Sequence, residues 1–196
     1  MIVVDVETTG LNSKKNSIVS IGAVDFSNPI NQFYEECRIW RGSKINPKAL
    51  EINGFSEEEI RSPNRKTLEK TIKEFVEWIE HIKDITLAGE NPSFDRDFLY
   101  DSAQRYGVNL HIGHRTIDLH SKCYIHLLKR GLTPPNKNKR SDLNADKIFE
   151  YVGLPIEPKP HKAIVGAKME AEAFSRLIYG KSLLKEFERY PLPNYL

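Results

Sequence analysis

The chain begins with a short apolar strand that carries two acidic residues, and this feature restricts its possible folds most. Residues 2–4 are Ile-Val-Val, and they are followed by Asp5, Val6 and Glu7. Side chains alternate along a strand, so Asp5 and Glu7 point to one face while Val6 points to the other, into the fold. Two neighbouring carboxylates repel each other unless a positive charge lies between them, and hard oxygen ligands suit magnesium or manganese. An isolated acid-x-acid pair arises often by chance, so it needs support from the rest of the chain.

The hydrophobic pattern predicts strands first and then helices that alternate with strands. Apolar positions at spacings of three and four predict an amphipathic helix over 66–83. β-branched and aromatic runs between turn residues predict strands over 2–6, 17–24, 33–39, 84–88 and 116–119. Helices are also expected over 93–106, 121–129, 144–152 and 163–178. A three-strand meander followed by this alternation predicts an α/β fold with a mixed sheet flanked by helices.

Composition fits one medium-sized domain. The chain has 196 residues, of which 39% are hydrophobic, enough for a single core. We expect the domain over 1–180 and a tail over 181–196 that packs on it. The net charge is only +2, so any nucleic-acid surface must come from local clusters. Cys37 and Cys123 lack zinc-type spacing, and no signal peptide or membrane span is evident, which predicts reduced thiols and a cytoplasmic location.

Two later motifs support the pair of acids. The run from Asn91 to Asp95 reads N-x-x-F-D, and the predicted helix places Asp95 in its first turn. His161 stands just before the last predicted helix, where a partly exposed side chain could reach a bound water. Taken alone, His161 is better explained as an ordinary loop histidine beside Pro160; the other motifs favour the functional role.

Together, these motifs resemble the DEDD superfamily of 3′-to-5′ exonucleases, in its DnaQ-like, histidine-bearing DEDDh branch. The likeness covers nearly the whole chain and includes the segments around Asn53, Asp118 and Asp146. It implies a ribonuclease-H-like fold and an enzyme that removes nucleotides from free 3′ ends of single-stranded DNA or RNA.

The chemistry implied by this resemblance is two-metal phosphodiester hydrolysis with Mg²⁺ or Mn²⁺. Two ions about 4 Å apart can activate a water, stabilise the phosphate and neutralise the leaving oxygen. The resemblance implies that Asp5 bridges both ions, that Glu7 holds one of them and that Asp95 reaches the other. His161 would accept the proton of the water, since an unperturbed histidine pKa of about 6.5 suits a general base at neutral pH.

The resemblance also implies a grip on the terminal nucleotide. A glycine after two threonines lets the chain turn sharply and frees amides and hydroxyls for the substrate, while a leucine packs under the base. An ordinary turn between strand and loop would explain the same residues. The expected substrate-binding residues are Thr8, Thr9, Gly10, Leu11 and Asn91.

One position departs from the family pattern. The family has an aspartate five residues after the histidine, and here that position is Gly166. Losing one carboxylate should weaken the binding of one of the two ions. Glu170 lies one helical turn further, about 5.4 Å away, so it could substitute only with strain. The alternative interpretation, which the neighbouring charges favour, is that Glu170 is an exposed helix acid near Lys168 and Arg176.

Three functions therefore remain open at the level of sequence. The first is an active exonuclease, and the second is a protein that keeps the fold and binds 3′ ends without turnover. The third is a proofreading subunit whose tail docks on a polymerase partner. A predicted basic loop could line the path of the nucleic-acid strand, and it contains Lys129, Arg130, Lys137, Lys139 and Arg140.

Overall fold

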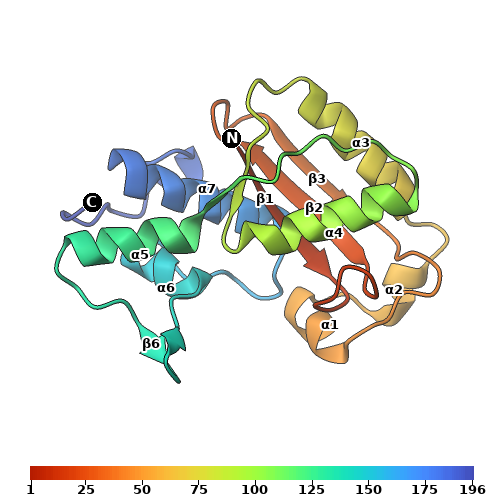
Figure 1. Ribbon diagram of the computed structural model, residues 1–196, viewed down its shortest axis with the longest axis horizontal. Helices are drawn as coiled ribbons and strands as arrows, with labels where there is room; N and C mark the ends of the chain where they lie inside the picture. The colour runs from red at the N-terminus through yellow and green to blue at the C-terminus, as the bar shows by residue number, and fades with distance from the viewer.

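A five-stranded mixed sheet forms the centre of the protein (Figure 1), as the sequence predicts. The structure is a computed structural model and describes residues 1–196. The strands are β1 (Ile2–Thr8), β2 (Ile18–Asp25), β3 (Gln32–Glu36), β4 (Leu87–Gly89) and β5 (Thr116–Asp118). Their order is β3-β2-β1-β4-β5; the β1 to β3 meander is antiparallel, and β4 and β5 run parallel to β1. This arrangement confirms the predicted ribonuclease-H-like fold class.

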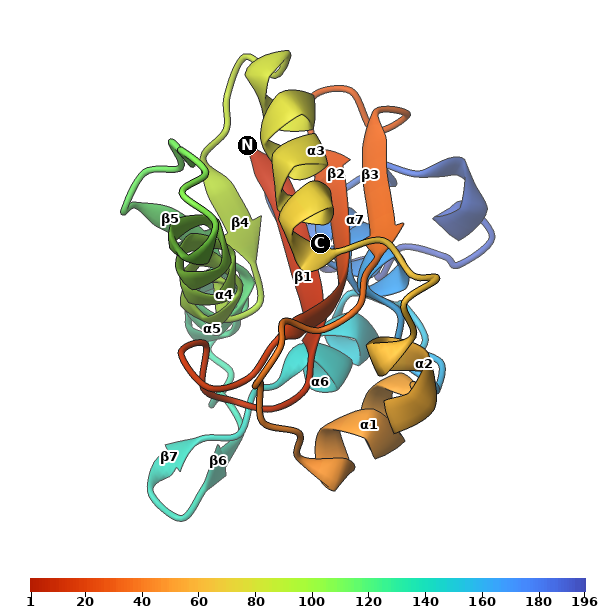
Figure 2. The same ribbon diagram turned by 90° about the vertical axis from the view of Figure 1, so that its right-hand side faces the viewer.

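Helices cover both faces of the sheet (Figure 2). On one face lie α3 (Leu68–Glu80) and α4 (Pro92–Arg105). The other face carries α5 (Leu119–Lys129), α6 (Ala145–Tyr151) and α7 (Ala163–Tyr179). Because side chains alternate along β1, the strand contributes to both hydrophobic cores. Val4 and Val6 pack toward α3 and α4, while Val3 packs toward α7. Asp5 and Glu7 share the face of Val3, so both acids point toward α7.

The structure contains several short elements that the sequence does not predict. They are α1 (Pro47–Asn53), α2 (Glu57–Arg61), the hairpin strands β6 (Asn136–Lys137) and β7 (Arg140–Ser141), and the 3₁₀ turn η1 (Lys185–Phe187). Each is too short for a periodic apolar stripe to be visible. Side-chain caps mark the two helices instead: Asn46 accepts from the backbone of Lys48, and Ser56 forms a capping box with Glu59.

Two elements are shorter in the structure than the sequence predicts. The strand expected over 84–88 starts only at Leu87, because Asp84 Oδ1 accepts from the Thr86 amide at 3.0 Å and closes a turn. The helix expected over 66–83 begins after Thr67, whose side chain caps it by accepting from the Lys70 amide. In both cases a polar side chain bonds the backbone locally and ends the regular element.

A glycine brings the start of α7 into direct contact with the sheet. Gly22 on β2 pairs with Asp5 on β1. A Cβ atom on Gly22 would lie 2.2 Å from the backbone carbonyl of Ala163, so only glycine fits beneath this helix. The close approach places Gly166, one turn into α7, directly over Asp5.

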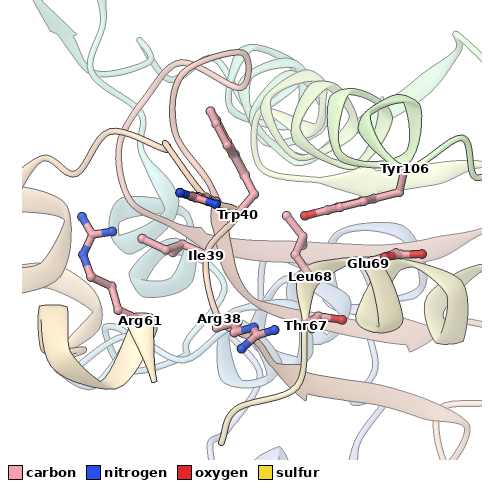
Figure 3. Close-up of a pocket in the computed structure, with 9 residues that line it drawn as sticks. Arg38, Ile39, Trp40, Arg61, Thr67, Leu68, Glu69 and Tyr106 are labelled. Atoms are coloured by element: carbon pink, nitrogen blue, oxygen red, sulfur yellow. The ribbon is translucent and has the colours of Figure 1, made fainter. Parts of the chain in front are cut away.

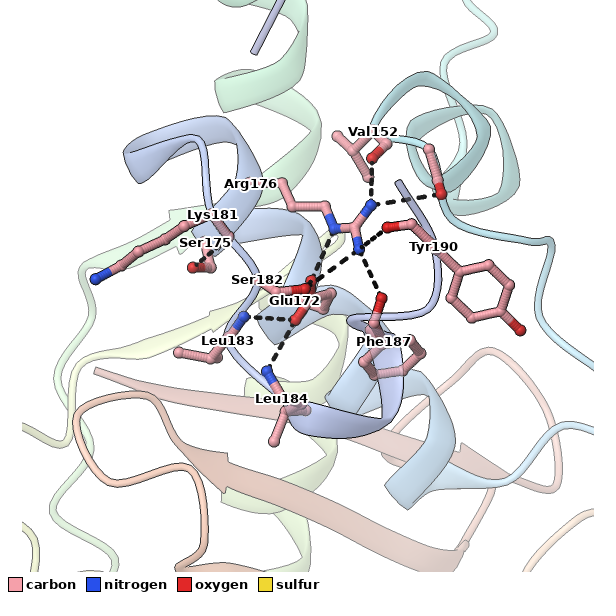
Figure 4. Close-up of polar contacts among 11 residues, drawn as sticks. Val152, Glu172, Ser175, Arg176, Lys181, Ser182, Leu183, Leu184, Phe187 and Tyr190 are labelled. Atoms are coloured by element: carbon pink, nitrogen blue, oxygen red, sulfur yellow. Dashed lines mark hydrogen bonds and ion pairs between the residues drawn. The ribbon is translucent and has the colours of Figure 1, made fainter. Parts of the chain in front are cut away.

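A buried ion pair ties α7 to the segment that follows it (Figure 4). Arg176 and Glu172 are 1% and 0% exposed, and Arg176 Nε lies 2.7 Å from Glu172 Oε1. The guanidinium also donates to the carbonyls of Val152, Phe187 and Tyr190, each at 3.0 Å. The segment after α7 therefore packs on the rest of the protein through a fully bonded charge pair. None of the helices combines the length and apolarity needed to cross a bilayer.

Candidate active site

Two acids of β1, Asp5 and Glu7, are joined by Asp95 from a distant part of the sequence, beyond the point where β4 stops pairing with β1. β4 pairs with β1 only through the first two residues of β1, so the backbone N–H of Val6 has no strand partner on that side. Asp95, in the first turn of α4, accepts from this N–H through Oδ1 at 3.0 Å. Asp95 is 4% exposed. This bond fixes its carboxylate at Val6, the residue that lies between Asp5 and Glu7 in β1.

The acids raise one another's pKa values. Burial, followed by the charges of Glu7 and Asp95, raises the pKa of Asp5 well above its ordinary value. Burial raises the pKa of Glu7 to about 7 and that of Asp95 to about 8. No lysine or arginine nitrogen lies within 4.0 Å of any of the three carboxylates. Asp95 is buried, and Asp5 and Glu7 are half-buried. A group of oxygen ligands in such a place, without a protein cation, fits a divalent metal ion.

Glu170 belongs to the same group of acids, so the interpretation of it as an exposed helix acid is wrong. Its side chain is 7% exposed, and its Oε2 atom is buried with no hydrogen-bond partner. The two basic residues expected beside it have other partners, because Arg176 pairs with Glu172 and Lys168 pairs with Glu186.

Gly166 leaves its space to Asp5. A Cβ atom on Gly166 would lie 2.2 Å from Asp5 Oδ2, which is far closer than van der Waals contact. A side chain at this position therefore requires Asp5 to adopt another rotamer. The absence of a side chain on Gly166 and the observed position of the Asp5 carboxylate depend on each other.

His161 faces Glu157, a residue that the sequence analysis did not consider. His161 Nδ1 lies 3.4 Å from Glu157 Oε2, and the ligand atoms of these two residues and Glu7 all lie within 4.8 Å of one another. Burial lowers the pKa of His161, whereas burial and the charge of Glu7 raise the pKa of Glu157 to about 7. The spacing of four residues between Glu157 and His161, within a proline-rich stretch, is the only sequence signal for this pair.

The threonine hydroxyls of the loop after β1 donate to backbone carbonyls of the protein. Thr8 Oγ1 donates to the Gly10 carbonyl at 2.8 Å, and Thr9 Oγ1 donates to the Lys44 carbonyl at 2.7 Å. Thr9 is 0% exposed, and its hydroxyl also accepts from the Ser17 amide at 2.9 Å, so it shapes the loop. Leu11, in contrast, is 84% exposed at the tip of the loop.

Two asparagines border the acids. Asn91 is exposed, has a φ of 55° and opens α4. It also lines a cleft of about 420 Å³ that includes Asp118 and His120. Asn53, at the end of α1, donates to the Thr8 carbonyl at 3.1 Å and also lowers the pKa of Glu7. Asn53 is thus a supporting residue whose contact with β1 is visible only in the structure.

Basic side chains lie away from the acids. Lys137, Lys139 and Arg140 are exposed on the β6–β7 hairpin, which extends from the body of the protein (Figure 2). A pocket of about 550 Å³ beside the end of β3 is lined by arginines and two aromatic residues, Trp40 and Tyr106 (Figure 3). None of the predicted site residues lines this pocket. The group of buried acids is therefore the candidate active site.

A ribonuclease-H-like sheet whose first strand contributes acids, joined by an acid from a later helix and by a histidine, defines the class of DEDDh-type exonuclease folds. The chain belongs to the RNase_T exonuclease family, whose model matches residues 2–174. This match confirms the family suggested by the sequence motifs.

Individual proteins agree with that assignment. The chain is 30% identical over 154 residues to the PolC-type DNA polymerase III of Streptococcus sanguinis, which covers 76% of the chain and 10% of the polymerase. The nuclease domain of 3′hExo, a DEDDh family member bound to rAMP, has a TM-score of 0.68, 13% identity and 94% coverage of both chains. Escherichia coli exonuclease I in complex with a dT13 oligonucleotide has a TM-score of 0.71 and 14% identity, and covers 91% of this chain and 41% of its own. The two solved structures show the shared fold, while the chain spans about a tenth of the length of the polymerase.

Proposed function

We propose that this chain is a metal-dependent 3′-to-5′ exonuclease that acts on single-stranded DNA or RNA. The observation that carries the proposal is the group of buried and half-buried acids without protein cations, built on the fold of an exonuclease family. Asp5, Glu7 and Asp95 would hold Mg²⁺ or Mn²⁺. When bound, such ions supply positive charge to the reacting phosphate and to the leaving 3′ oxygen.

The histidine supplies proton transfer. Because His161 Nδ1 faces Glu157, its Nε2 atom is the nitrogen left to accept a proton from water. Burial lowers the pKa of His161, which keeps the ring neutral and able to act as a base at neutral pH. Glu157 orients the ring and stabilises the imidazolium that forms, so it is a positioning residue.

The loop tip and the start of α4 would bind the 3′ end. Leu11 is free to pack against the terminal base, and Asn91 is exposed beside Asp95. A solved complex of exonuclease I contains a dT13 oligonucleotide, which favours a single-stranded substrate for the shared fold. The basic β6–β7 hairpin would contact phosphates further along the strand.

The direct test is degradation of 5′-labelled single-stranded DNA and RNA oligonucleotides with Mg²⁺ or Mn²⁺, with a free or a phosphate-blocked 3′ end. We expect a ladder that shortens from free 3′ ends and is lost in Asp95→Asn. Internal cleavage, or release of the 5′ label as a mononucleotide at the start of the reaction, would contradict the proposal. Oligonucleotide binding without any cleavage would identify a protein that binds 3′ ends without turnover.

A proofreading role beside a polymerase is a second candidate, because the S. sanguinis relative is a PolC-type DNA polymerase III. In this role the chain would remove mismatched 3′ ends, and the segment after α7 would contact the polymerase. Copurification of a polymerase with the tagged chain tests this candidate. A chain recovered without one would contradict it.

A further inference from the structure

Glu170 is a buried carboxylate to which the proposed function gives no role. It is 7% exposed, its Oε2 atom has no hydrogen-bond partner, and no lysine or arginine pairs with it. A protonated carboxyl would be expected to donate to an acceptor, and a charged one needs a cation when it is buried. A backbone hydrogen bond at Glu90 lowers the pKa of Glu170 in part, but Oε2 has no partner and no basic side chain pairs with the carboxylate.

The geometry of two glycines directs this side chain toward Asp5. Side chains on a helix lean toward its N-terminus, so Glu170 leans over the turn that contains Gly166, where no side chain intervenes. On the sheet below, a Cβ atom on Gly89 would lie 3.1 Å from Glu170 Oε2 and 3.0 Å from the carbonyl oxygen of Val4. The carboxylate of Glu170 therefore lies on the surface of β1 and β4, beside the residue that precedes Asp5.

We propose that Glu170 is a ligand of a divalent cation in the site formed by Asp5 and Asp95, in place of a side chain at position 166. This inference rests on the proposed metal-dependent function. The electrostatics agree with it: burial and the charges of Asp5, Asp95 and Glu90 all raise the pKa of Glu170, so a bound cation would relieve repulsion among these acids. Glu170 lies one turn beyond Gly166 on α7, while the Asp5 carboxylate occupies the space beside Gly166.

The test measures metal binding without substrate. Titration calorimetry with Mn²⁺ at pH 8 compares the full chain with Glu170→Gln and with the control Glu186→Gln. Glu186 is exposed and pairs with Lys168, which lies on the same helix as Glu170. We expect Glu170→Gln to weaken Mn²⁺ binding by about 10- to 100-fold or to abolish one of the bound ions. The control should bind Mn²⁺ as the parent does. If Glu170→Gln does not fold, Glu170→Asp keeps the charge, shortens the reach by one methylene and should also weaken binding.

The outcomes separate this inference from the proposed function. Unchanged Mn²⁺ binding in a folded Glu170 variant would overturn the inference, even if the parent degrades oligonucleotides. Binding that depends on Glu170 in a parent that leaves oligonucleotides intact would support the inference and contradict the exonuclease proposal. A parent that binds no Mn²⁺ would contradict both.

Discussion

The repulsion among the buried acids predicts that the metal-free protein loses stability as the pH rises. The pKa of Glu7 is about 7 in the folded protein and 4.5 ordinarily. Between these values the folded state keeps a proton that the unfolded state has lost, so the contribution of Glu7 to stability is most favourable below pH 4.5 and falls as the pH approaches 7. At about 1.4 kcal/mol for each pH unit, Glu7 alone lowers the free energy of unfolding by at most about 3 kcal/mol. For a chain of this size that corresponds to a decrease of about 6–12 °C in Tm.

The assay follows Tm between pH 5 and 8 for the parent, Glu7→Gln and the exposed control Glu51→Gln, with EDTA or with Mn²⁺. Glu7→Gln should be more stable than the parent at pH 8 and similar to it at pH 5 when metal is removed. Mn²⁺ should stabilise the parent more at pH 8 than at pH 5, because the deprotonated acids bind it. Parallel curves for the parent and Glu7→Gln in EDTA would refute the reasoning, since they would mean that the Glu7 charge is already compensated in the folded protein.

Four further substitutions test the site and the packing of α7. His161→Ala should lower kcat by about 10²- to 10⁴-fold while Mn²⁺ binding, measured by calorimetry, stays at the parent level. Glu157→Gln should cause a smaller loss in kcat. Equal kcat values for His161→Ala and the parent would exclude a general base at this position. Glu172→Gln should lower the free energy of unfolding in guanidinium by about 3–5 kcal/mol, because it leaves the buried Arg176 charge unpaired; a loss below about 1 kcal/mol would contradict this. Leu11→Ala should raise KM for a short oligonucleotide with unchanged Tm, since the side chain is 84% exposed; an unchanged KM would remove Leu11 from the proposed grip.

The sequence predicted the central architecture because its signals are local. Alternation along β1 was enough to place Asp5 and Glu7 on one face, and a run of apolar positions at helical spacing was enough to reveal α3. The short helices and the β6–β7 hairpin were missed because their signals are single caps and turns. The convergence of Asp95 with β1 was expected only from the resemblance, since the free N–H of Val6 that anchors it depends on how far β4 extends.

The error on Glu170 has a physical origin. Its neighbours in sequence, Lys168 and Arg176, suggested a solvated helix surface, but α7 is covered on nearly every side by the sheet and by the segment that follows the helix. Gly22 allows this helix to lie directly on β2, and no local pattern reveals that contact. Which acid faces the site is therefore decided by tertiary packing.

The central claim is that the site works as a nuclease with the acids that the chain has. The most direct measurement is cleavage of a 5′-labelled single-stranded oligonucleotide with Mg²⁺ or Mn²⁺ by the parent, Asp5→Ala and Gly166→Asp. We predict a ladder from the parent, none from Asp5→Ala, and no gain from Gly166→Asp, whose new Cβ atom would lie 2.2 Å from Asp5 Oδ2 in the present arrangement. Cleavage by Gly166→Asp alone would contradict the account, because it would mean that the parent lacks an essential ligand and only binds 3′ ends.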